Sequence, residues 1–258
     1  MNIGILLGFA AAATIFVTTI VLSFDNPFVL VDFKSALIVV GGTFAAAMIC
    51  FPLGQLIVLV KLLFTRTFQD QANEMVDLVD ELKKLAVAAR GGRNAFEKAT
   101  KEIKHHFLRD GAEILFWTDE DITDGELREL LITRAEMQHE RNSGDATQIK
   151  TISQFPPAFG LMGTTIGMIS LLQGLSEDGG GSLGQSMAIA LITTLYGLFF
   201  ANIMLIPMSE NLIKQSHNDN MARLMVVDCL MLIHEKKPPR YVEDYALSFL
   251  APRDRPKK

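Results

Sequence analysis

The longest hydrophobic runs of this sequence lack charge in their interiors. Residues 3–24, 35–60, about 149–175 and about 183–208 carry no Asp, Glu, Lys or Arg within their cores, although 21% of the chain is charged. A charge at the centre of a bilayer costs at least about 2.5 kcal/mol, and a helix needs about 20 apolar residues to cross one. The sequence therefore predicts four transmembrane helices, which excludes an ordinary soluble domain.

The sequence also has few cysteines and no excess of basic residues. The only cysteines are Cys50 and Cys229, which excludes a disulfide framework and predicts two buried thiols. A net charge of −5 gives no reason to expect nucleic-acid binding.

Enzyme chemistry has no support in the sequence either. No GK[ST] motif follows the glycines near Gly160 and Gly163, so they form no phosphate loop. The adjacent His105 and His106 have no nearby cysteine that would complete a metal site, and we expect them to be solvated. We expect no enzyme, no cofactor and no resident metal.

The first hydrophobic run has neither a basic segment before it nor an A-x-A cleavage site after it, so it is predicted to be a retained helix. Basic residues then predict the orientation of the spans. Fourteen Lys and Arg lie between residues 61 and 150, nine follow residue 208, and the short connectors contain only Lys34. The positive-inside rule places connector one (25–33) and connector two (176–182) outside, with both termini cytoplasmic.

The polar segments have helical periodicity. Leu78, Leu82, Leu85 and Val87 recur at nearly helical spacing, and Thr123-x-x-Glu126 is typical of a capping box. With no alternating strand pattern, the fold class is all-α. We expect spans one and two within residues 1–60, a cytoplasmic helical domain at 61–148, spans three and four at 149–208, and a cytoplasmic helix and tail at 209–258.

The third and fourth runs have small residues on one helical face each. Gly160, Gly163 and Gly167 follow i, i+3, i+7. In the fourth run, Ala190, Thr194, Gly197 and Ala201 follow i, i+4, i+7, i+11 and also share one face. Small residues let helix backbones approach closely in lipid. Packing within the chain alone would also explain this pattern.

Polar residues on these runs indicate an ion path. Thr164 and Thr194 could offer hydroxyl oxygens to a partly dehydrated cation, although a Thr can also bond its own i−4 carbonyl. Pro157 within the third run, and Pro207 ending the fourth, would free backbone carbonyls or permit bending. Proton or sodium pathways normally use an intramembrane carboxylate, and none is present here. A partner would have to bring it.

Several motifs together resemble the flagellar stator A subunits, the MotA and PomA family, and are most similar to the sodium-driven type. They are Pro156-Pro-Ala-Phe-Gly-Leu-Met-Gly-Thr-Thr-Ile-Gly167, Met187-Ala-Ile-Ala-Leu-Ile-Thr-Thr-Leu-Tyr-Gly197, Leu37-Ile-Val-Val-Gly-Gly-Thr43 and Pro239-Arg-Tyr-Val-Glu. The resemblance covers nearly the whole chain.

The resemblance implies five A subunits around two copies of a B subunit, which has one transmembrane helix with an essential Asp and a peptidoglycan-binding domain. Sodium, favoured over protons, would pass that Asp in the bacterial inner membrane and drive torque on the rotor switch protein. A transient Na⁺ would lie near Thr164 and Thr194, with Tyr196 in the same pattern. Pro157 and Pro207 would be coupling prolines, and Arg90 and Glu97 rotor contacts. Lys98 departs from the family pattern, where a second Glu is common.

Two other functions remain open at this point. The chain could be a TolQ/ExbB-like energiser of outer-membrane transport, a group that usually has three spans in a different loop order. It could also be a carrier or scaffold that conducts no ions itself.

Overall fold

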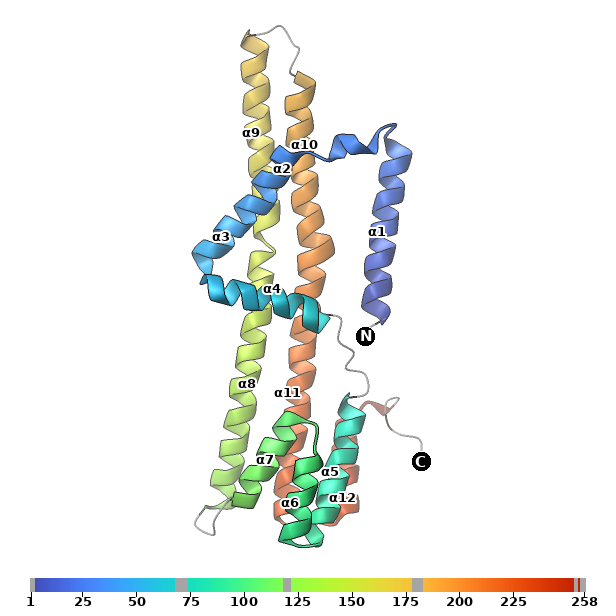
Figure 1. Ribbon diagram of the computed structural model, residues 1–258, viewed down its shortest axis with the longest axis vertical. Coiled ribbons are helices and arrows are strands. Elements are labelled where there is room, and N and C mark those ends of the chain that lie inside the picture. Colours follow the sequence, from blue (N-terminus) through green and yellow to red (C-terminus); the bar gives the residue numbers. More distant parts are fainter. Residues whose placement is uncertain (1–2, 68–73, 118–121, 178–182, 253–254, 256–258) are drawn as a thin grey trace. The chain divides into compact units, whose positions relative to one another are not determined.

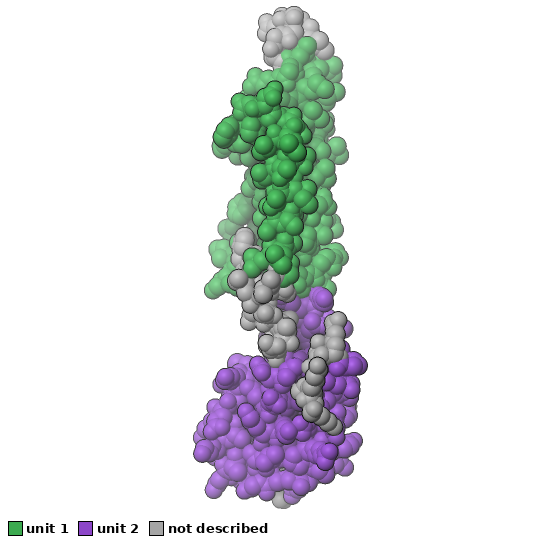
Figure 2. Space-filling view, turned by 90° about the vertical axis from the view of Figure 1, so that its right-hand side faces the viewer, with its two compact units in different colours: residues 1–69, 144–213 green, residues 70–143, 214–258 purple. Residues whose placement is uncertain are grey.

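The computed structural model describes residues 3–67, 74–117, 122–177, 183–252 and 255, and within these residues every regular element is a helix (Figure 1). The all-α prediction is confirmed. Two compact units are present: residues 1–69 with 144–213, and residues 70–143 with 214–258 (Figure 2).

The first unit contains the hydrophobic helices. Four helical segments of the described chain are long and apolar enough to cross a membrane. The unit is built from α1 (Ile3–Ser23), the 3₁₀ turn η1 (Pro27–Leu30), α2 (Phe33–Ala36), the π-helical η2 (Leu37–Gly41), α3 (Gly42–Cys50) and α4 (Leu53–Thr67). It also contains the end of α8 (Asp124–Ile152), α9 (Phe155–Glu177), α10 (Leu183–Phe199), the π-helical η3 (Phe200–Leu205) and the start of α11 (Ile206–His234).

The second hydrophobic helix is shorter than the sequence indicated. It was expected to reach residue 60, but the helix ends at Cys50, where Phe51 is extended with φ −134°. Pro52 explains this end, because the residue before a proline is disfavoured in the α conformation. A separate helix, α4, then begins at Leu53.

The helices that contain the last two predicted spans are interrupted or continue beyond them. The third predicted span, about 149–175, includes the break between α8, which ends at Ile152, and α9, which begins at Phe155. Helical structure continues past the fourth predicted span, about 183–208, as α11 to His234.

The second unit has its own apolar core. It consists of α5 (Glu74–Arg90), α6 (Arg93–Glu102), α7 (His106–Trp117), the start of α8, the end of α11 and α12 (Pro239–Ser248). Leu78, Leu82 and Leu85 are all at most 1% exposed, whereas Val87 is 56% exposed, so the buried face of α5 omits Val87.

Hydrogen bonds explain where two helices of this unit begin. The Thr123 amide donates to Glu126 Oε2 at 2.9 Å, and the Glu126 amide donates to Thr123 Oγ1 at 3.3 Å, which confirms the capping box of α8. His105 caps α7, because its Nδ1 accepts a hydrogen bond from the Leu108 amide at 3.3 Å. The His105 side chain is half-buried, so the expectation that it is solvated is wrong.

The two thiols differ in burial. Cys229 is buried in the core of the second unit, which raises its pKa to about 12 and leaves the thiol protonated. Cys50 is exposed in the isolated chain, contrary to the expectation of two buried thiols.

Candidate functional site

The close packing of α9 against α10 positions the candidate site (Figure 1). A Cβ atom on Gly160 would lie 3.0 Å from the Thr193 carbonyl oxygen, and one on Gly163 would lie 2.6 Å from the Thr193 side chain. A Cβ atom on Gly167 would lie 2.7 Å from Ala190 Cβ. The three glycines of α9 therefore face α10. Because none of them has a side chain, atoms of α10 occupy the space beside each glycine.

Gly197 makes the matching contact from α10. A Cβ atom there would lie 2.5 Å from the Pro156 carbonyl oxygen and 3.2 Å from Gly160 Cα. Both neighbours are backbone atoms, so no side-chain rotation could relieve the clash. The helices can approach this closely only with glycine at this position.

Two hydroxyls and two backbone carbonyls converge at the centre of this contact. The Thr164 and Thr194 hydroxyls are hydrogen-bonded to each other. Thr164 Oγ1 also lies within hydrogen-bond distance of the carbonyl oxygens of Gly160, at 3.1 Å, and Ala190, at 3.0 Å. Thr194 Oγ1 lies 3.4 Å from each of the same two carbonyls. The spacing of the sequence thus brings four oxygens, two from each helix, into one half-buried cluster.

Such a cluster can offer oxygen ligands to a hard cation. Backbone carbonyls and hydroxyls can replace part of the water around an ion. Residues 155–175 and 183–208 contain no carboxylate, so these helices supply oxygens without negative charge.

A second hydroxyl pair lies further along the same two helices. Ser170 Oγ and Ser186 Oγ are 3.2 Å apart, and Ser186 is buried. These serines were not predicted from the sequence. The signal was present, since Ser186 is four residues before Ala190 and so continues the small-residue face of α10.

The hydrogen bonds of Tyr196 lead away from this cluster. Its hydroxyl donates to the Leu30 carbonyl and accepts the Asp32 amide at 3.3 Å. Asp32 in turn caps α2, because its Oδ2 accepts the Ser35 amide at 2.7 Å. Tyr196 therefore ties connector one to α10.

The two prolines lie at irregular points of their helices. Pro157 is the third residue of α9, in the first turn of this helix, which follows the break at Ser153 and Gln154 that separates it from α8. Pro207 is the second residue of α11 and directly follows the π-helical η3. Neither proline has an N–H group. Pro207 lies within continuous helical structure, so it leaves a carbonyl of the preceding turn without its usual helical donor. Pro157 lies in the first turn of its helix, where an N–H group would have no acceptor within the helix.

Arg90 and Glu97 flank the Gly91-Gly92 turn between α5 and α6. Gly92 has φ +95°, in the region that favours glycine. Arg90 is exposed at the end of α5. Glu97 is partly exposed and accepts a hydrogen bond from Lys101 at 2.7 Å, which lowers the pKa of the Glu97 carboxyl.

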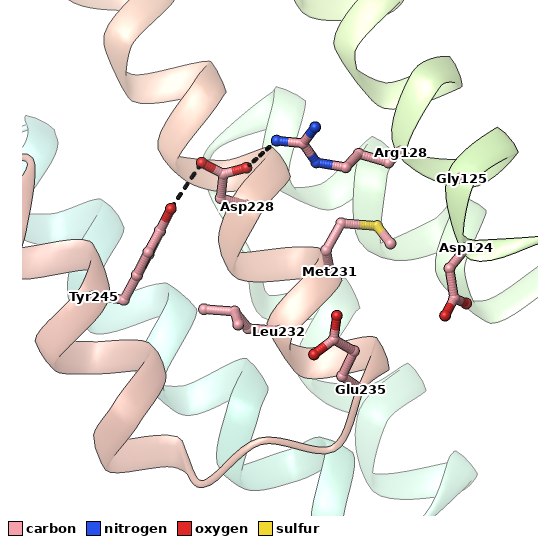
Figure 3. A pocket seen from close by; sticks show the side chains of 8 residues that line it. All are labelled: Asp124, Gly125, Arg128, Asp228, Met231, Leu232, Glu235 and Tyr245. Carbon is pink, nitrogen blue, oxygen red and sulfur yellow. Dashed lines mark hydrogen bonds and ion pairs between the residues drawn. The ribbon is translucent and has the colours of Figure 1, made fainter.

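The second unit contains a surface pocket of about 330 Å³ between α8, α11 and α12 (Figure 3). Asp228 lies at its wall, where it pairs with Arg128 at 3.0 Å and accepts a hydrogen bond from the Tyr245 hydroxyl at 3.1 Å. These contacts connect three helices. Among the described residues, no group of three His, Cys, Asp or Glu side chains is placed to hold a metal ion.

A family profile and the sequences of individual known proteins relate this chain to the same group of proteins. Residues 99–225 match the profile of the MotA/TolQ/ExbB proton channel family. Motility protein A of Borreliella burgdorferi is 31% identical over 229 residues, covering 87% of this chain and 84% of that protein. Chemotaxis protein PomA of Vibrio alginolyticus is 28% identical and covers 85% and 84%.

Two solved structures have the same fold. C. jejuni MotAB superposes with a TM-score of 0.84 at 22% identity, covering 98% of this chain and 97% of that one. The flagellar MotAB stator complex of Bacillus subtilis gives 0.82 at 24% identity, covering 98% and 96%.

Proposed function

Because the chain belongs to the MotA/TolQ/ExbB proton channel family, we propose that it is the ion-conducting A subunit of a flagellar stator. As a member of this channel family, it is not an enzyme. Cation flow past an Asp of a B subunit would drive rotation and torque, with sodium favoured over protons. The B subunit would have one transmembrane helix and a peptidoglycan-binding domain.

The observation that carries this proposal is the oxygen cluster formed by Thr164, Thr194 and the carbonyls of Gly160 and Ala190. It is a set of neutral ligands on two tightly packed apolar helices. A cation there needs an opposite charge, because an uncompensated charge in a membrane is costly. An acidic side chain from another polypeptide would meet this need, which fits the missing carboxylate.

The assembly is part of the same proposal. Five A subunits would surround two B subunits in the bacterial inner membrane, with both termini of this chain cytoplasmic. Pro157 and Pro207 would couple ion passage to movement of the spans. Arg90 and Glu97 would contact the rotor switch protein. The relatives named above are a motility protein and a chemotaxis protein, and four helices here can cross a membrane, so the three-span energiser alternative has less support.

The test compares the two threonines of the oxygen cluster, one on α9 and one on α10, with a threonine on another face of α9. Thr164→Ala and Thr194→Ala should abolish swimming while the protein remains in the membrane, and both Thr→Ser variants should retain it. Thr165→Ala is the matched control, since Thr165 is exposed and its hydroxyl bonds the Leu161 carbonyl of its own helix at 3.1 Å.

Normal swimming of Thr164→Ala and Thr194→Ala would contradict the proposed ion path. Swimming speed measured as a function of external Na⁺ concentration at fixed pH decides whether sodium or protons are the coupling ion. A speed that does not depend on Na⁺ would remove the sodium assignment and leave the stator assignment in place.

A further inference from the structure

The two adjacent glycines of the second predicted span have different surroundings. Gly42 is the first residue of α3, directly after the π-helical η2. A Cβ atom on Gly42 would lie 2.5 Å from Cε1 and 2.7 Å from Cγ of Phe159, and Cδ1 of the same ring would be closer still. A Cβ atom on Gly41 would make only an ordinary contact, 3.6 Å from Leu37 Cδ1. The ring of Phe159 therefore requires glycine at residue 42, whereas residue 41 has room for a methyl group.

Phe159 makes this contact from α9. Its side chain is half-buried, and both η2 and α3 pack against α9 (Figure 1). The next residue, Gly160, faces α10 instead, where a Cβ atom would lie 3.0 Å from the Thr193 carbonyl oxygen. Consecutive residues of a helix point about 100° apart, so Phe159 and Gly160 can face two different helices. At this level α9 is therefore held between the second span and α10.

The backbone beside Phe159 belongs to the oxygen cluster. The Gly160 carbonyl oxygen lies 3.1 Å from Thr164 Oγ1 and 3.4 Å from Thr194 Oγ1. One planar peptide unit joins Phe159 to Gly160, so a shift of the Phe159 backbone carries Gly160 with it. Close-packed surroundings pass such a shift on instead of absorbing it. The contact with Gly42 therefore bears on where the Gly160 carbonyl oxygen lies.

We propose that the contact between Phe159 and Gly42 positions the Gly160 carbonyl for the passing cation. The inference rests on the proposed function, because it concerns the same oxygen cluster. Phe159 and Gly42 are positioning residues, since neither has a polar side chain to offer an ion. The ring acts as a spacer that fixes the distance between the second span and α9. That distance sets how α9 presents its carbonyl to the hydroxyls of Thr164 and Thr194.

A contact that only holds the helices together would have different effects when it is altered. It would change the amount of folded complex in the membrane, and the complexes that do assemble would need the same ion concentration as before. A positioning contact changes the ion affinity of the assembled complex, because one oxygen ligand moves while the fold is kept. The ion concentration that gives half-maximal swimming speed therefore separates the two roles.

The experiment compares four variants of the full chain, each with its B subunit, in swimming cells. Gly42→Ala pushes against the ring, Phe159→Leu removes the ring, and Gly42→Ala/Phe159→Leu combines a larger residue with a smaller one. Gly41→Ala is the matched control, since a methyl group there meets only an ordinary contact. The measurements are the external Na⁺ concentration that gives half-maximal speed at fixed pH and the amount of protein in the membrane.

Gly42→Ala and Phe159→Leu should each raise the half-maximal Na⁺ concentration roughly fivefold, the factor that the loss of one polar contact brings to an equilibrium constant. The double variant should return this concentration close to that of the unaltered chain, because exchanges that conserve volume are tolerated best. Gly41→Ala should leave it unchanged.

An unchanged half-maximal Na⁺ concentration in Gly42→Ala would overturn the inference, whether or not less protein reaches the membrane. If Gly42→Ala leaves no protein there, Phe159→Leu decides in the same way. Single effects that simply add in the double variant would also overturn it, because the two residues would then act independently. Normal swimming of Thr164→Ala and Thr194→Ala would instead remove the proposed ion path, and the positioning role with it. If the unaltered chain is indifferent to Na⁺, the four variants are compared against external pH with the same expectations.

Discussion

Gly197→Ala tests whether the contact between α9 and α10 sets the geometry of the oxygen cluster. The new methyl group would lie 2.5 Å from the Pro156 carbonyl oxygen, whereas ordinary van der Waals contact begins at 3.4 Å. The two backbones must separate locally by about 0.9 Å, because neither contact atom belongs to a flexible side chain. Thr194 Oγ1 is already 3.4 Å from the Gly160 carbonyl, so this separation should break that contact.

Overpacking of this kind typically costs about 1–3 kcal/mol, which corresponds to roughly 5–150-fold in an equilibrium constant. We therefore expect a lower melting temperature of the purified complex and a large loss of swimming speed. Gly184→Ala is the matched control, since Gly184 lies on the same helix and a Cβ atom there would meet nothing within 4 Å. Both assays should be normalised to the amount of protein in the membrane.

The reasoning is refuted if Gly197→Ala and Gly184→Ala have the same melting temperature and the same swimming speed. A stable Gly197→Ala complex that fails to swim would show that the contact serves ion passage more than assembly.

Two further predictions concern the second unit. Leu82→Ala should lower the free energy of unfolding by about 2–5 kcal/mol, because Leu82 is 0% exposed. Denaturant titration of Trp117 fluorescence measures this, and Val87→Ala, at an exposed site, should change the free energy of unfolding by less than about 0.5 kcal/mol. Equal effects of the two substitutions would contradict the assignment of Leu82 to the core. Burial lowers the pKa of His105 below its usual 6.5, so the folded state binds fewer protons than the unfolded one, and stability should be full above pH 6.5 and decrease as the pH falls below it. His105→Gln should flatten this decrease in melting temperature, and an unchanged pH profile would refute it.

Hydropathy and small-residue spacing predicted the membrane helices and the face on which α9 meets α10. Both signals are local, because charge is excluded from a span and close helix contacts require small residues. Thr164 and Thr194 were therefore identified from the sequence, and the structure brings them together.

The end of the second membrane helix was missed although its signal was present. Pro52 disfavours the α conformation at Phe51, but hydropathy continues through it to Val60. A hydrophobic run does not reveal a change of direction, so α4 was merged with the preceding span. Weighting the proline above the apolar run would have separated the two helices.

Other features depend on tertiary contacts that spacing cannot give. The Tyr196 hydroxyl bonds Leu30, a residue 166 positions earlier in the chain. His105 is half-buried only because neighbouring helices cover it, so a pair of adjacent histidines looked like surface residues.

The π-helical segment η3 (Phe200–Leu205) also bears on how this chain can vary in length. A π turn holds one residue more than the α-helical turn it replaces, and one residue corresponds to about 100° of rotation around a helix axis. A deletion of a single residue within 200–205 would convert the segment to an ordinary α-helix and keep Gly197 and Met208 on their present faces. The same deletion within α10 would turn every following side chain away from α9, so natural length variation in this helix should be confined to η3.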